Sequence, residues 1–262
     1  MKERADKLLV ARGLAASQEK AQALIMAGLV SSDGQAVTKP GSLVDEAAGL
    51  ALKETLPFVS RGGLKLAEAL DRFAVDVRGR TAVDVGSSTG GFTDCLLQRG
   101  ARKVYAVDVD TAQLDWKLRG DPRVSLVEKN ARYLGPGDIA EPVGIITVDV
   151  SFISLVKVLA ALKSLLGDGL LLALVKPQFE AGRREVGKKG IVRDPAVHEA
   201  VLRRVVAGAR EAGFVLRGLI RCSTRGQKGN IEFFGCWSGT GPDAGRDREE
   251  VWIKEAVKNE DH

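Results

Sequence analysis

Hydrophobic residues recur at helical spacing near the start of the chain, which predicts two short helices. The first spans about 4–11 and is followed by Gly13, a residue type that tolerates a left-handed helix cap. The second spans 20–26, with Ser17 placed as its N-cap and Gly28 at its end. Two helices with such clear limits indicate a compact unit at the N-terminus.

The pattern then changes to one that predicts a hairpin and a domain boundary. Residues 29–37 are predicted to form two short strands joined through Asp33-Gly34, a dipeptide suited to hairpin turns. Pro57 disfavours a helix at the preceding residue and lacks a backbone donor. We therefore predict a small α+β domain over 1–55 and a linker over 56–60.

Beyond the linker, apolar runs typical of buried strands alternate with helical patterns. A helix is predicted over 63–73, and strand-like runs follow at 81–85, 103–107, 124–127, 145–148 and 170–175. Strands that alternate with helices favour right-handed crossovers and a mostly parallel sheet. After a helix over 198–212, the runs 215–220 and 231–237 are predicted to pair as a hairpin at the sheet edge. Residues 61–262 are therefore predicted to form an α/β domain with a mostly parallel, seven-stranded, Rossmann-like sheet.

The first strand of this sheet ends in a glycine-rich turn. Residues 81–85 lead into Gly86-Ser87-Ser88-Thr89-Gly90-Gly91-Phe92, and a helix-compatible stretch follows. In such a strand-to-helix turn, glycines let backbone amides approach a ligand, and the helix N-terminus favours its negatively charged parts. The spacing G-x-x-x-G-G differs from the dinucleotide fingerprint G-x-G-x-x-G. The turn is therefore predicted to bind a nucleotide-type cofactor, with NAD disfavoured.

Polar residues at the ends of the next two strands complete a predicted adenosine pocket. Asp108 comes 22 positions after Gly86, where a carboxylate can accept hydrogen bonds from both hydroxyls of a ribose. Asn130, just past the following strand, can hydrogen-bond an adenine edge or serve as a turn residue. The predicted cofactor-binding residues are Gly86, Ser87, Ser88, Gly90, Gly91, Phe92, Asp108, Val109, Asn130 and Asp149.

Four charged residues of alternating sign are predicted to meet beside this pocket. Asp149 ends the fourth strand and Lys176 the fifth, so both lie on the carboxyl edge where open α/β sheets bind ligands. Lys65 lies on the helix before the first strand, and Glu232 lies near the start of the last strand. Taken singly, each residue could instead belong to an ordinary surface ion pair. Together, Lys65, Asp149, Lys176 and Glu232 are the predicted catalytic set.

Three motifs in the N-terminal unit carry a resemblance to a known module. They lie at 6–10, 21–25 and 33–35 and read Asp-Lys-Leu-Leu-Val, Ala-Gln-Ala-Leu-Ile and Asp-Gly-Gln. With these motifs the unit resembles the S-four-type RNA-binding domain, which occurs in a small-subunit ribosomal protein and in some pseudouridine synthases. The resemblance implies that the helices present basic residues to RNA, here Arg4, Lys7, Arg12 and Lys20.

Five longer motifs carry a more specific resemblance in the second domain. They lie, in this order, at 60–66, 84–92, 149–155, 175–180 and 229–233. With them the domain is similar to the FtsJ-type ribose 2′-O-methyltransferases, which have a Lys-Asp-Lys-Glu tetrad. Nearly the whole chain resembles the hemolysin A/TlyA family of rRNA methyltransferases. The resemblance implies S-adenosylmethionine as cofactor, S-adenosylhomocysteine as product, and methylation of a ribose 2′-hydroxyl, of cytidine, in 16S rRNA, 23S rRNA or both.

The predicted tetrad can support this chemistry. A ribose hydroxyl is a weak acid, so its attack on a sulfonium methyl group needs a base or surroundings that stabilise the developing oxyanion. Lys176 is the candidate for that role, and Asp149 and Glu232 would orient the two lysines and limit the repulsion between them. The predicted reaction is an in-line methyl transfer without a metal or a covalent intermediate.

The charge of the chain is compatible with a nucleic-acid partner. The 262 residues include 39 Lys and Arg against 34 Asp and Glu, and the sequence pI is 9.1, which is a modest basic excess. A glycine-containing basic stretch between 178 and 193 is predicted to hold RNA phosphates, with a solvated loop as the alternative. The predicted RNA contacts of the second domain are Arg61, Arg183, Arg184, Lys188, Lys189 and Arg193.

Other residues bear on compartment and metal content. No apolar stretch approaches the roughly 20 residues of a membrane helix, and the N-terminus lacks the apolar run of a signal peptide. Cys95, Cys222 and Cys236 are widely spaced, and with His198 and His262 they form no recognisable metal set. We therefore expect a cytoplasmic protein whose partner is ribosomal RNA or a ribosomal subunit, with no metal and no membrane association. The sequence makes no prediction of oligomeric state.

The sequence offers fewer of the residues that competing functions would require. A cytosine-C5 methyltransferase needs a cysteine nucleophile, and Cys95 lies inside the helix after the cofactor turn. Amino-group methyltransferases commonly carry prolines after the fourth strand, and residues 149–152 have none. A pore-forming hemolysin needs a membrane-active segment. A non-catalytic ribosome-assembly factor would tolerate loss of Lys176 or of the glycine turn, and both are present.

Overall fold

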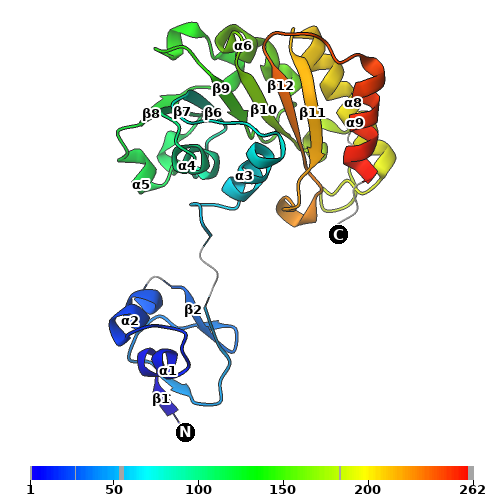
Figure 1. Ribbon diagram of the computed structural model, residues 1–262. Helices are drawn as coiled ribbons and strands as arrows, with labels where there is room; N and C mark the ends of the chain where they lie inside the picture. The colour runs from blue at the N-terminus through cyan, green and yellow to red at the C-terminus, as the bar shows by residue number, and fades with distance from the viewer. Residues whose placement is uncertain (1, 27, 53–55, 183, 259–262) are drawn as a thin grey trace. The chain divides into compact units, whose positions relative to one another are not determined.

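The computed structural model describes residues 2–26, 28–52, 56–182 and 184–258. The chain divides into two compact units, residues 1–56 and residues 57–262 (Figure 1). Each unit has a hydrophobic core of its own, so each is described by itself.

The first unit packs two helices with two small antiparallel sheets. Helix α1 (Ala5–Ala11) contacts α2 (Gln18–Met26). One sheet pairs β1 (Lys2–Arg4) with β4 (Leu43–Asp45), and the other has the order β3 (Gln35–Ala36), β2 (Val30–Ser32), β5 (Leu50–Leu52). Small and branched apolar side chains, among them Leu9 and Ile25, form the core. The two predicted helices and the predicted hairpin are confirmed.

Local signals in the sequence explain where these helices and strands begin and end. The Ser17 hydroxyl accepts the Lys20 backbone N–H at 3.2 Å and so caps α2. Asp33 and Gly34 have φ values of 48° and 79°, the left-handed turn that joins β2 to β3. β1, β4 and β5 were not predicted, because strands of three residues carry little alternation and, unlike β2, these strands have no Asp-Gly turn beside them to mark them.

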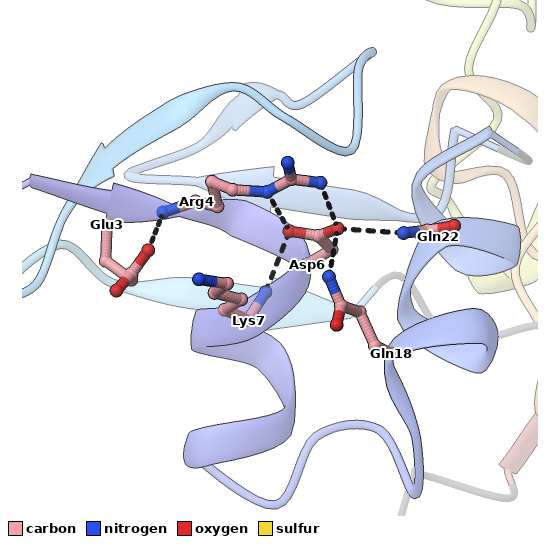
Figure 2. A network of polar contacts seen from close by, with 6 residues as sticks. All are labelled: Glu3, Arg4, Asp6, Lys7, Gln18 and Gln22. Carbon is pink, nitrogen blue, oxygen red and sulfur yellow. Dashed lines mark hydrogen bonds and ion pairs between the residues drawn. The ribbon is translucent and has the colours of Figure 1, made fainter.

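A buried carboxylate ties three elements of the first unit together. The Asp6 side chain accepts hydrogen bonds from Arg4 Nε and Nη2, at 3.0 and 2.7 Å, and from the amides of Gln18 and Gln22, at 3.0 Å each (Figure 2). The hydrogen bonds from Arg4 and then from the two glutamines hold the pKa of Asp6 far below its usual range, although burial opposes this shift. The network therefore fixes β1, α1 and α2 against one another.

The second unit is built on a seven-stranded sheet (Figure 1). The strand order is β11-β12-β10-β9-β6-β7-β8; β10, β9, β6, β7 and β8 run parallel, and β12 runs antiparallel to both of its neighbours. The strands are β6 (Thr81–Val85), β7 (Lys103–Asp108), β8 (Val124–Glu128), β9 (Ile145–Val148), β10 (Leu170–Val175), β11 (Val215–Arg221) and β12 (Phe233–Ser238). All seven predicted strands are present, and the predicted α/β, Rossmann-like class is confirmed.

Helices cover both faces of this sheet. Packed on one face are α6 (Val156–Leu166), α8 (Pro195–Glu211) and α9 (Arg246–Lys258). Packed on the other are α3 (Gly62–Arg72), α4 (Gly91–Gln98) and α5 (Trp116–Arg119). Burial on both faces explains why the parallel strands are nearly continuous apolar runs. The short elements are η1 (Thr111–Gln113), η2 (Ala131–Tyr133), η3 (Pro136–Asp138), α7 (Pro177–Glu180) and η4 (Gln227–Gly229).

Residues at the start of the second unit pack on α3 and α4. The Val59 backbone N–H donates to Asp94 at 2.8 Å, and the Gln98 side chain donates to the Pro57 carbonyl at 2.9 Å. A side chain at Gly63 would bring its Cβ within 2.3 Å of the Phe58 ring. Glycine at the start of α3 therefore lets Phe58 lie against the helix.

Candidate active site

Two adjoining cavities open at the carboxyl edge of the parallel strands. The first has a volume of about 560 Å³, and the second has a volume of about 530 Å³. Both volumes are typical of small-molecule sites. The cavities share a wall that consists of Gly86, Ser88, Asp149, Ser151 and Phe152. The two cavities therefore lie side by side along this wall.

One ion pair links the shared wall to the first cavity, because Asp149 lines both cavities and Lys176 lines the first. Lys176 Nζ is 2.5 Å from Asp149 Oδ1, and the side chains are 13% and 24% exposed. Lys176 Nζ also donates to the Ser151 hydroxyl at 3.0 Å. Because β9 and β10 are parallel neighbours, the residues that follow them meet at the same edge of the sheet.

A second ion pair lies deeper in the first cavity. Lys65 Nζ is 2.6 Å from Glu232 Oε2, and these side chains are 10% and 2% exposed. The Gln178 amide donates to the other Glu232 oxygen at 3.2 Å. A Cβ at Gly226 would lie 2.0 Å from that oxygen, so only glycine leaves room for the carboxylate. The structure thus brings all four predicted catalytic residues to the lining of one cavity.

The glycine-rich turn needs its glycines for close approach. Gly86 has a φ of 83°, and a Cβ there would lie 2.5 Å from the Asp149 carbonyl oxygen. A Cβ at Gly91 would lie 2.2 Å from the Ser60 hydroxyl. Gly90 caps α4 with a φ of 98° and, among the described residues, lines neither cavity. The turn therefore fits closely against the loops that carry Asp149 and Ser60.

The second cavity carries the acceptors expected of an adenosine site. Asp108 accepts one backbone N–H on each oxygen, from Ser88 at 2.9 Å and from Asp110 at 3.2 Å. A carboxylate oxygen has two lone pairs, so each keeps one for a ribose hydroxyl. Asn130 accepts the Arg132 N–H at 3.0 Å, which leaves its amide nitrogen available to donate. Val109 is 64% exposed and forms part of the cavity lining.

Two other predicted cofactor residues differ in their surroundings. The Ser87 hydroxyl lies against the first cavity, is buried, and has no hydrogen-bond partner within the described residues. A buried polar atom of this kind calls for a partner such as a ligand group. Phe92 is 3% exposed and packs on Phe234 with ring centroids 5.7 Å apart. It therefore belongs mainly to the core and borders the cavity with one edge.

A buried acid lies directly behind the turn. Asp84, on β6, is fully buried and accepts the hydroxyls of Thr93, at 2.7 Å, and Thr147, at 3.0 Å. Burial raises the pKa of Asp84 to about 7, and the two threonine hydrogen bonds oppose that rise. The side chain joins the first turn of α4 to β6 and β9, and so supports the glycine turn from within.

The cavity wall also contains aromatic residues that the sequence did not single out. Phe152 is 92% exposed, has a φ of 65°, and lies with its ring centroid 5.1 Å from that of Phe179. A non-glycine residue in this left-handed conformation is strained, which is common at functional sites. Both residues lie inside motifs noted above, but only the backbone angle and the exposure distinguish Phe152 from a core residue.

The residues predicted to contact RNA differ in whether they are exposed or bonded within the protein. In the first unit Lys7 and Lys20 are exposed, Arg4 is held by Asp6, and Arg12 donates to the Ala48 carbonyl at 2.6 Å and to that of Glu46. In the second unit Arg61 is exposed and lines the first cavity. The remaining four described candidates, Arg184, Lys188, Lys189 and Arg193, are exposed. Arg183 lies outside the described residues.

The chain is similar to known proteins. Residues 58–238 match the family described as FtsJ-like methyltransferase, and residues 3–48 match the S4 domain. YqxC of Bacillus subtilis, provisionally named an rRNA methyltransferase, is 52% identical over 88% of this chain and 84% of its own length. TlyA of Mycobacterium tuberculosis, named a 16S/23S rRNA (cytidine-2′-O)-methyltransferase, is 44% identical over 88% of each chain. A solved structure from Streptococcus thermophilus, provisionally named a hemolysin, is 44% identical with a TM-score of 0.74 and covers 98% of this chain and 96% of its own.

Proposed function

Because the chain belongs to the FtsJ-like methyltransferases, in the TlyA/hemolysin A family, we propose that it methylates a ribose 2′-hydroxyl of ribosomal RNA. S-adenosylmethionine is the methyl donor, and the target is cytidine in 16S rRNA, 23S rRNA or both. The observation that carries the proposal is the wall shared by the two cavities, where Asp149 holds Lys176.

The residues of both cavities fit the cofactor. Asp108 would accept the two ribose hydroxyls of its adenosine, and Asn130 would donate to the adenine edge. The unpartnered Ser87 hydroxyl would meet the amino-acid end, near the N-terminus of α4. When bound, S-adenosylmethionine supplies a methyl group on a positively charged sulfur. S-adenosylhomocysteine is the product that leaves the site.

Lys176 is the group that we propose acts on the RNA hydroxyl. Its Nζ lies in the first cavity beside Asp149 and Ser151, two residues that line both cavities. At that position it accepts the hydroxyl proton or, as an ammonium ion, stabilises the oxygen as negative charge develops. The Asp149 carboxylate holds the charged form of Lys176 as an ion pair, and the Ser151 hydroxyl accepts a hydrogen bond from Nζ.

The Lys65–Glu232 pair completes the charged lining. Glu232 has one oxygen on Lys65 and the other on Gln178, so its carboxylate cannot turn freely. Its role in the proposal is to hold Lys65 in place beside the substrate. The pair is more deeply buried than the Lys176–Asp149 pair, which suits an orienting role rather than proton exchange with solvent.

Ribosomal RNA is the proposed partner because an RNA-binding module accompanies the catalytic unit. The S4 match covers most of the first unit, where Lys7 and Lys20 are exposed cations. In the second unit Arg61 and the basic stretch 184–193 lie on the surface, and Arg61 lines the catalytic cavity. Such cations favour backbone phosphates regardless of base sequence. A cytoplasmic location follows from the proposed substrate.

Some relatives are named hemolysins, which suggests hemolytic activity as another hypothesis. No helix within the described residues is both long and apolar enough to cross a membrane. The observation that favours the enzyme over a pore is the fit of the two cavities to a methyl donor.

Methyl transfer to purified ribosomal subunits tests the proposal. The protein is incubated with methyl-tritiated S-adenosylmethionine and with small or large subunits from cells that lack this modification. We expect label in the RNA of at least one subunit. If the protein binds the cofactor and the subunits but leaves both RNAs unlabelled, the alternative of a non-catalytic ribosome-assembly factor replaces the proposal.

A further inference from the structure

One buried asparagine joins the basic stretch to the catalytic cavity. Asn230 is 2% exposed and precedes Glu232 by two residues. Its amide nitrogen donates to the Gly190 carbonyl at 2.9 Å, and its amide oxygen accepts the Val192 backbone N–H at 3.1 Å. The side chain therefore bonds to the backbone of 190–192 much as a neighbouring strand would. The assignment of oxygen and nitrogen is fixed, because one partner is an acceptor and the other a donor.

A second buried side chain holds the same point of the chain from α8. His198 is 2% exposed, and its Nε2 lies 3.2 Å from the Val192 carbonyl oxygen. Because a carbonyl can only accept, Nε2 carries the hydrogen in this contact. Burial is the main cause that lowers the pKa of His198, which favours the neutral ring. The ring also packs edge-on against Phe233, the residue after Glu232, with centroids 5.5 Å apart.

The stretch that these two residues anchor is strongly basic. Arg184, Lys188, Lys189 and Arg193 are exposed, and within the described ranges none of them forms an ion pair with an acidic side chain. Lys189 has a φ of 79°, a left-handed conformation unusual for lysine. Exposed cations without acidic partners are available for an anionic ligand.

The anchor also borders the catalytic cavity. Gly190, Lys228 and Asn230 line the first cavity on the side of Glu232. The Asn230 carbonyl accepts the Gly226 N–H at 2.9 Å, and Gly226 is the glycine that packs against the Glu232 carboxylate. Movement of the basic stretch would therefore be transmitted to the loop that positions Glu232.

We propose that Asn230 is a positioning residue for the substrate: it fixes the basic stretch 184–193 so that RNA backbone phosphates beside the target ribose are held in register with the catalytic cavity. The inference rests on the proposed function. It differs from the interpretation of 184–193 as a freely solvated loop, because such a loop would not require two buried side chains bonded to the backbone at its foot. His198, on α8, supports the same point of the chain. Its Nε2 bonds to the Val192 carbonyl, whereas Asn230 accepts the Val192 N–H.

The substitution Asn230→Asp keeps the size of the side chain and the acceptor for Val192. It replaces the donor to Gly190 by an oxygen that repels the carbonyl, so the basic stretch should loosen. We expect trypsin to cut after Lys188 or Lys189 several-fold faster, and the KM for subunit RNA to rise about tenfold, more than kcat falls. The affinity for S-adenosylmethionine should stay within twofold. Ala196→Asp adds the same charge at an exposed site on α8 and serves as the matched control.

A double-mutant cycle separates this role from a general structural one. In a Lys188→Ser/Lys189→Ser background, Asn230→Asp should change KM by less than twofold, because the two cations next to Gly190, the residue that Asn230 holds, are already lost. If Asn230→Asp does not fold, His198→Phe keeps the packing on Phe233 and removes the contact to Val192, and the same results are expected. The inference is overturned if trypsin cuts the Asn230→Asp protein no faster than the wild type. It is also overturned if Asn230→Asp still raises KM tenfold in the Lys188→Ser/Lys189→Ser background. If the wild-type protein transfers no methyl group, the proposed function is refuted instead. Trypsin cutting and RNA affinity would then still test whether Asn230 anchors the basic stretch.

Discussion

Lys176 Nζ lies 2.5 Å from Asp149 Oδ1, and the two residues follow β10 and β9, which are neighbouring parallel strands. Asp149 belongs to the wall shared by the two cavities, and Lys176 lines the cavity in which we propose that the RNA hydroxyl binds. In the proposed reaction, a cation at this position acts on the ribose hydroxyl as it attacks the methyl group. The position follows from the topology, because parallel neighbours deliver their following residues to the same edge.

Removal of Lys176 should abolish catalysis and leave the cofactor bound. Lys176→Ala removes the group that acts on the hydroxyl, so we expect kcat to fall by about 100-fold or more. Isothermal titration calorimetry should give an S-adenosylmethionine affinity close to that of the wild type. Lys157→Ala, an exposed lysine on α6, is the matched control and should keep full activity. Equal activity of the Lys176→Ala and Lys157→Ala proteins would exclude Lys176 from the reaction.

The buried Lys65–Glu232 pair should show strong coupling in stability. Either Lys65→Met or Glu232→Gln leaves an unpaired buried charge, which costs about 3–5 kcal/mol of unfolding free energy. The double variant removes both charges, so it should be more stable than the sum of the two single effects predicts. Urea denaturation of the four proteins measures this coupling. Strictly additive losses would mean that the two side chains do not interact in solution.

Asp108 should contribute to cofactor affinity and not to the chemical step. Asp108→Ala removes two acceptors for ribose hydroxyls, so the dissociation constant of S-adenosylmethionine should rise about 10- to 100-fold. At saturating cofactor, kcat should recover to within a few-fold of the wild type. Asp115→Ala, which removes the cap of α5, controls for loss of a nearby carboxylate. An unchanged dissociation constant would place the adenosine elsewhere.

Asp84 should make folding stability depend on pH between about 4 and 7. Its pKa is raised from 3.8 to about 7, so the folded protein keeps a proton that the unfolded chain releases. The stability due to the neutral acid is complete below about pH 4 and is lost as the pH rises to about 7, at about 1.4 kcal/mol per pH unit.

Asp84→Asn cannot titrate at this position, so it isolates the effect from all other groups. The melting temperature of the variant relative to the wild type should increase from pH 4 to pH 7 and then level off. Differential scanning calorimetry across this range provides the measurement. Parallel curves for the two proteins would show that Asp84 is ionised throughout.

Much of the fold was predictable because its signals are local. The seven strands of the second unit are marked by apolar runs, and the turn after β2 by Asp33-Gly34. The approach of Lys176 to Asp149 could also be anticipated, since both residues end parallel strands. The pairing of β11 with β12 at the sheet edge was predicted, but not that β12 is the strand beside β10, because no local pattern records which of the two faces the parallel strands.

Other parts of the site could not be predicted from residue types. Gln178 and Asn230 are ordinary polar residues in the sequence, and only their buried partners show what they hold. The strained, exposed conformation of Phe152 depends on the packing of two loops that are distant in the sequence. Arg4 and Arg12 were predicted to face RNA, but the structure adds internal acceptors that no local pattern indicates.

Alkaline hydrolysis of the labelled RNA tests the central claim most directly. Alkali cleaves RNA by attack of the 2′-hydroxyl on the adjacent phosphate, so a methyl group on that oxygen blocks cleavage. We predict that the label incorporated by the wild-type protein appears in an uncleaved dinucleotide, and that this product is absent with Lys176→Ala. Label recovered only in mononucleotides would place the methyl group on a base and contradict ribose methylation.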